Sequence, residues 1–130
     1  MSDFLDIFNA QVRPEKPPPI SYSEPRALAA MCAAELLSLM AGSNAHIAAG
    51  LDDPDIFVIA HSAAINLSMA VGWLNQAEKR ARAQLSSTLT LTWAHKCVAR
   101  ALEHLRRLKP RCDLAGLRDR VTHLLTLLAP

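Results

Sequence analysis

Residues 56–74 read IFVIAHSAAINLSMAVGWL, a long run without a charged side chain. At 100° per residue, one side of a helix through this run is apolar, formed by Ile56, Ala60, Ala63, Leu67, Ala70, Val71 and Leu74. The opposite side also carries apolar residues, namely Val58, Ile65, Met69 and Trp73. A helix that is apolar on two sides is buried on two sides. We therefore expect one side in a core and the other in either the same core or an interface.

The same run has about the length of a membrane span. His61, Asn66, Gly72 and two serines interrupt it, which favours a soluble helix over a membrane helix. The N-terminal residues lack the basic segment and the cleavage site of a secretory signal. Three widely spaced cysteines are typical of a reducing compartment. We expect a cytoplasmic protein that does not enter a membrane.

The rest of the chain extends the helical pattern. Its 130 residues are enough for one domain with its own core, and few of its side chains are aromatic, which is typical of close-packed helices. Further helices are expected from Ser23 to Gly42, from Ser86 or Ser87 to Lys109, and after Asp113 as a cap. The predicted fold is an all-α antiparallel bundle of four, at most five, helices.

A proline-rich linker divides the chain. Residues 13–25 read RPEKPPPISYSEP, whose prolines forbid a helix and favour an extended chain. The predicted organisation is an N-terminal arm at 1–12, this linker at 13–25 and a helical bundle at 26–130. The arm is apolar through Phe4, Leu5, Ile7 and Phe8.

The net charge of +2 hides an uneven distribution. Residues 1–65 carry three Lys or Arg against eight Asp or Glu, whereas residues 66–130 carry eleven against four. This division suits either internal attraction between the halves or a basic face for nucleic acid. The basic residues gather at opposite ends of an antiparallel bundle, which favours the first interpretation over nucleic-acid binding.

The last helix contains RDRVTH at residues 118–123, which resembles the signature of HEPN-type ribonucleases, small helical proteins that build a site across a dimer. The resemblance implies that Arg118 and His123 handle the scissile phosphate while Asp119 orients the arginine. A fixed cation beside an imidazole suits this metal-independent chemistry. On a helix, however, Arg118 and His123 are about 140° apart, so they could meet only across two subunits.

The sequence contains no pattern typical of a cofactor-binding or metal-binding site. No glycine-rich phosphate loop, Cys-x-x-Cys pair or helical histidine pair occurs, so we expect no cofactor and no metal and lean against an enzyme. The sequence favours a small regulator, adaptor or assembly component that binds a protein partner, itself, or both. The predicted contact residues are Val58, Ile65, Met69 and Trp73, with the arm residues Phe4, Leu5, Ile7 and Phe8 docking in the same or in another subunit.

Overall fold

The computed structural model describes residues 22–41, 54–108 and 114–129. These ranges contain four α-helices and no strand, which confirms the all-α class. The helices are α2 (Ser23–Ala41), α4 (Pro54–Arg82), α5 (Thr88–Leu108) and α6 (Ala115–Leu128).

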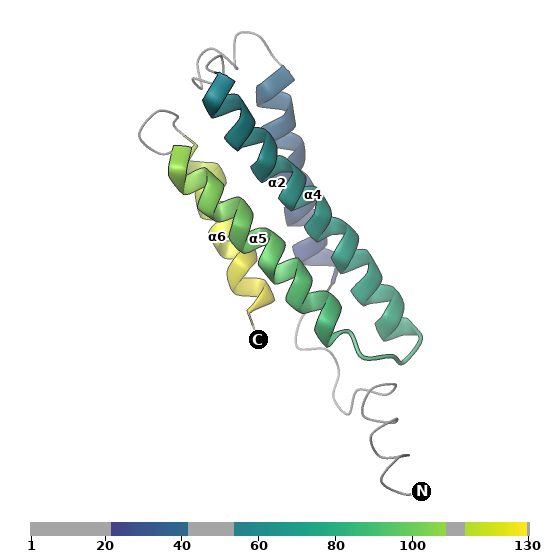
Figure 1. The fold of residues 1–130 in the computed structure, drawn as a ribbon. Coiled ribbons are helices and arrows are strands. Elements are labelled where there is room, and N and C mark those ends of the chain that lie inside the picture. The colour runs from purple at the N-terminus through teal and green to yellow at the C-terminus, as the bar shows by residue number, and fades with distance from the viewer. Residues whose placement is uncertain (1–21, 42–53, 109–113, 130) are drawn as a thin grey trace, which may run out of the picture.

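The four helices form a closed ring in which each helix packs against two others. Contacts join α2 to α4, α4 to α5, α5 to α6 and α6 back to α2. Helices that follow one another run in opposite directions, and α4 is the longest (Figure 1). The predicted antiparallel four-helix bundle is therefore confirmed. Each helix has one side in the ring's centre, and its opposite side faces outward.

The core is built from leucine and alanine. Leu67 and Leu74 of α4 are fully buried, as are Leu36 of α2, Leu105 of α5 and Leu124 of α6. The predicted inner stripe of α4 is buried except at its edge, where Val71 is half-buried against the core. Alanines between the leucines let the helices approach closely, and this explains how a bundle with few aromatic residues fills its centre.

One helix start agrees with the expectation, and one cap differs from it. The Tyr22 carbonyl accepts the hydrogen bond of the Arg26 N–H at 3.2 Å, and α2 begins at Ser23, the predicted start. Residues 23–25, assigned to the linker, thus form the first turn of α2. Pro25 is tolerated there because the first turn needs no N–H donor at that position. In α6 the cap position belongs to Leu114, whose carbonyl accepts from the Arg118 N–H at 2.9 Å and whose side chain makes no cap bond. Asp113, the expected cap, lies outside the described residues.

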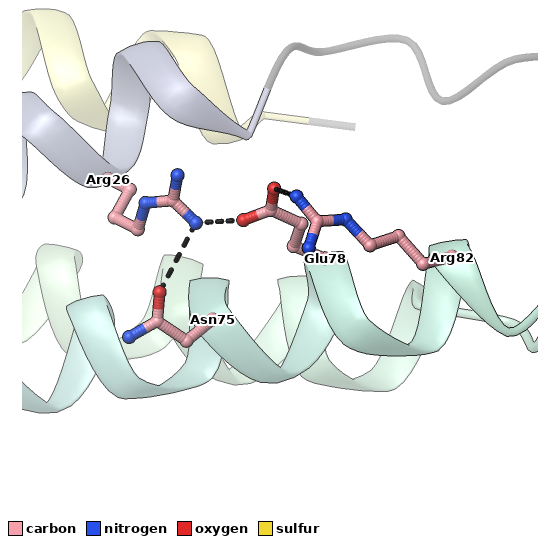
Figure 2. A network of polar contacts seen from close by, with 4 residues as sticks. All are labelled: Arg26, Asn75, Glu78 and Arg82. Carbon is pink, nitrogen blue, oxygen red and sulfur yellow. Dashed lines mark hydrogen bonds and ion pairs between the residues drawn. The ribbon is translucent and has the colours of Figure 1, made fainter.

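A polar network fixes the start of α2 to the end of α4 (Figure 2). The Arg26 guanidinium forms an ion pair with Glu78 and donates a 3.3 Å hydrogen bond to Asn75 Oδ1. The second carboxylate oxygen of Glu78 accepts from Arg82 at 2.7 Å. The network sets the side of α4 on which α2 lies.

A third ion pair, Glu35 with Arg120, joins α2 to α6. It connects an acidic residue of the first half of the sequence to a basic residue of the second. Part of the charge difference between the two halves is thus neutralised by an ion pair within the fold.

Removing the Glu78 carboxylate should destabilise the bundle more than removing one of its partners. Glu78→Ala leaves the half-buried Arg26 guanidinium without its anion, and we expect a loss of about 1 kcal/mol in the free energy of unfolding. Arg82→Ala should cost less than about 0.5 kcal/mol because that side chain is 75% exposed. Urea denaturation of both variants measures the difference, and equal losses would contradict this account of the network.

Candidate interaction surfaces

The predicted contact residues of α4 divide into two groups. Val58, Ile65 and Met69 are exposed by 62%, 45% and 47% of their surface. Trp73 is half-buried and stacks on Trp93 of α5, with ring centroids 6.0 Å apart. The first three residues therefore leave apolar surface in solvent, whereas Trp73 also serves the packing of α4 on α5.

The outer surface shared by α2 and α4 is apolar and uncharged. The contact of Arg26 with Glu78 defines which side of each helix faces the other, and rotation by 100° per residue then places the remaining positions. We call this surface the α2–α4 face; its exposed residues are Ala27, Ala30, Ala34, Leu37 and Ala41 of α2, and Phe57, His61, Ile65, Ser68 and Gly72 of α4.

The contribution of α2 to this face was missed by the sequence reasoning, which treated that segment only as a bundle helix. A signal was present in the stretch 27–41, ALAAMCAAELLSLMA, where Glu35 is the sole charged residue. Glu35 points to α6, where it pairs with Arg120. The outward side of α2 is thus left with alanine, serine, Leu37 and Met31.

Small residues from the two helices meet at the same levels of the α2–α4 face. Because α2 and α4 are antiparallel and Arg26 contacts Asn75, one turn further along each helix brings Ala30 beside Gly72. The next turn brings Ala34 beside Ser68. A Cβ atom at Gly72 would meet nothing within 4 Å, so packing within the chain does not require this glycine.

Gly72→Ala should therefore stabilise the folded chain by about 0.5–1 kcal/mol, since a glycine inside a helix is destabilising relative to alanine. Gly116→Ala is the control outside the α2–α4 face: a Cβ there also meets open space, and the gain should be smaller because Gly116 lies in the first turn of α6. Thermal unfolding at a concentration where the protein is monomeric measures both changes. A loss of stability at Gly72→Ala would show that the position is constrained within the chain.

The outer surface shared by α4 and α5 has a different character. Apolar side chains lie along it, and the Lys96 ammonium sits 4.8 Å above the ring of Trp93. Arg100 and Arg107 occupy the same outward side of α5. We call this surface the α4–α5 face; its residues are Val58, Met69, Trp73, Leu89 and Trp93, with the cations Lys96, Arg100 and Arg107.

Two of the described cysteines are buried, Cys97 near the α4–α5 face and Cys32 on the side of α2 towards α6. Burial raises the pKa of Cys97, and the smaller opposing influences are the Arg100 charge and a hydrogen bond with Trp73. Burial likewise raises the pKa of Cys32, against the nearby charge of Arg120. Both thiols are thus kept protonated at neutral pH, which makes them poor nucleophiles. Cys112 lies outside the described residues.

The residues of the ribonuclease hypothesis do not converge within one chain. His123 and Asp119 are exposed on the outer side of α6, while Arg118 is half-buried on the flank towards α5. The ribonuclease interpretation stays a prediction that requires a second subunit. Within the described residues, no group of three His, Cys, Asp or Glu side chains is placed to hold a metal ion.

The arm residues Phe4, Leu5, Ile7 and Phe8 lie outside the described residues. Among the described helices, α4 is long and apolar enough to cross a membrane by length and composition. In the bundle, 33% of its most apolar window is buried, and the core helix of a soluble protein meets the same criteria.

The fold and surfaces define a small four-helix bundle with an uncharged outer face on α2 and α4 and a basic, tryptophan-containing face on α4 and α5. Comparisons of the chain with protein-family models, with curated proteins and with solved structures found no match.

Proposed function

We propose that this protein is a small interaction module that pairs with a second copy of itself through the α2–α4 face and acts in the cytoplasm as a regulator, adaptor or assembly component. The observation that carries the proposal is the exposed side of α4 between Asp55 and Glu78. It contains no charged residue, and within the α2–α4 face it exposes Phe57 and Ile65 beside Leu37 of α2. A continuous apolar surface of this kind marks an interaction site on a soluble protein.

The lack of charge favours a second copy as the partner. In a two-fold dimer each patch meets its own copy, so any charge on it would face a like charge or require a matched partner nearby. The α2–α4 face avoids this conflict from Ala30 to Ala41 of α2, beyond the polar network of Arg26 and Glu78. Small residues at Ala30, Ala34, Ser68 and Gly72 would also let the helices of two copies approach closely.

The size of the face suits a dimer of moderate strength. Two helices about 10 Å wide and about 28 Å long, the length of α2, give roughly 570 Å² on each subunit. A pair would bury about 1,100 Å², slightly more than the roughly 1,000 Å² expected of a biological interface. We therefore expect an equilibrium between monomer and dimer that depends on protein concentration.

Sedimentation equilibrium over a wide concentration range tests the proposal. The mean mass should rise from the chain mass of 14.2 kDa towards twice that value. A monomer at all concentrations would contradict self-pairing. Flotation of the monomer with neutral phospholipid vesicles would instead assign the α2–α4 face to a lipid surface.

A further inference from the structure

The α4–α5 face carries features that pairing through the α2–α4 face leaves unused. Leu89 and Val58 are its most exposed apolar residues, at 68% and 62%. One turn along α5 from Leu89, Trp93 stacks on Trp73, and Lys96 lies over the Trp93 ring. The three ion pairs of the described residues use Arg26, Arg82 and Arg120, so the cations of this face take part in none of them.

An apolar strip edged by cations suits an occupant that is both apolar and acidic. Residues 3–8 of this chain read DFLDIF, in which four apolar residues surround Asp6 and follow Asp3. We propose that this segment binds the α4–α5 face of its own chain, with its apolar side chains against Met69, Trp73 and Trp93 and its carboxylates towards Lys96 and Arg100. This proposal does not rest on the pairing of α2–α4 faces.

The point at which the described chain begins supports binding within one chain. The Tyr22 hydroxyl lies 2.8 Å from Ser87 Oγ, directly before the start of α5. From Ser87, Lys96 lies about 14 Å further along α5. Residues 9–21 precede Tyr22, and a proline-rich segment of that length spans up to roughly 40 Å at about 3.1 Å per residue. The tether is long enough to bring residues 3–8 onto the face.

The same tether makes binding within the chain more effective than binding between chains. A linker of this length gives an effective concentration on the order of millimolar, whereas another copy is present only at the concentration of the protein. A contact that is too weak to persist between separate molecules would thus still form within one molecule. When the segment is bound to the α4–α5 face, it shields this face from external partners.

Tryptophan fluorescence tests this proposal in the full-length chain. Trp73 and Trp93 are the two tryptophans of the protein, and both lie on the face. In a variant with Phe4, Leu5, Ile7 and Phe8 all changed to Ala, we expect emission to shift to the red and the acrylamide quenching constant to rise roughly twofold, because the indoles gain access to solvent. Asp3→Asn with Asp6→Asn should give a smaller change that is absent at high salt.

Glu15→Gln is the matched control, since it removes one acidic charge from the linker and should leave the fluorescence unchanged. The effect of the arm variant should be the same at all protein concentrations and should persist in an Ile65→Glu background, in which the α2–α4 face cannot pair. Fluorescence that does not respond to the arm variant would overturn the proposal. Shielding that appears only as concentration rises would also overturn it, by assigning the segment to another copy.

Discussion

Ile65→Glu should convert the dimer to a monomer while leaving the bundle folded. Ile65 is exposed near the middle of the α2–α4 face, and a two-fold dimer would bury two copies of the new carboxylate without partners. We expect the dissociation constant to rise by roughly two to three orders of magnitude, equivalent to about 3–4 kcal/mol. Sedimentation equilibrium measures the change directly.

Thr92→Glu is the control for this variant, because Thr92 is exposed on α5, away from the α2–α4 face, and the substitution adds the same charge. It should leave the dissociation constant unchanged. Circular dichroism should show unaltered helix content for both variants, since glutamate is a good helix former. Equal weakening by the two substitutions would indicate a general effect of charge and contradict the proposed interface.

Leu67→Ala should produce the largest loss of stability of the substitutions considered. Leu67 lies two positions from Ile65 on the same helix but is fully buried in the bundle. Truncation removes apolar contacts and leaves a cavity, which costs about 3–4 kcal/mol. Because small domains are stable by only about 5–15 kcal/mol, the variant should lose a large share of its stability. Urea denaturation at a concentration where the protein is monomeric measures this loss.

Met69→Ala provides the comparison for Leu67→Ala, two positions further along α4. Met69 is exposed, so its truncation should cost less than about 0.5 kcal/mol in the monomer. Similar losses at the two positions would mean that the orientation of α4 in the bundle is wrong.

The fold could be predicted from the sequence because helical periodicity and helix ends are local properties. The stripe from Ile56 to Leu74 identifies the inner side of α4, and the breaks near Pro54 and Ser86 place its ends. The structure bears out this orientation, with Leu67 and Leu74 buried and Ile65 exposed. The caps were less predictable, since Tyr22 and Leu114 hold cap positions without a favourable cap side chain.

The interaction surfaces could be predicted from the sequence only in part, because they depend on which helices become neighbours. Trp73 was predicted as a contact residue, but its stacking on Trp93 depends on α5 lying beside that side of α4. The uncharged side of α2 could be recognised as part of an interaction surface only because α2 lies beside the side of α4 that carries Ile65 and Gly72. A sequence pattern gives the direction of a side chain around its own helix, and it does not give the neighbour that this side chain meets.

Pairing of two copies through the α2–α4 face is tested most directly by isotope-filtered NMR on an equimolar mixture of protein labelled at the isoleucine δ1 methyl groups and unlabelled protein. Ile65 is exposed on the face, while Ile56 is buried in the core and serves as an internal control. We expect intermolecular contacts at the Ile65 methyl group and none at the Ile56 methyl group. A sample of doubled mass without an intermolecular contact at Ile65 would contradict the proposed interface.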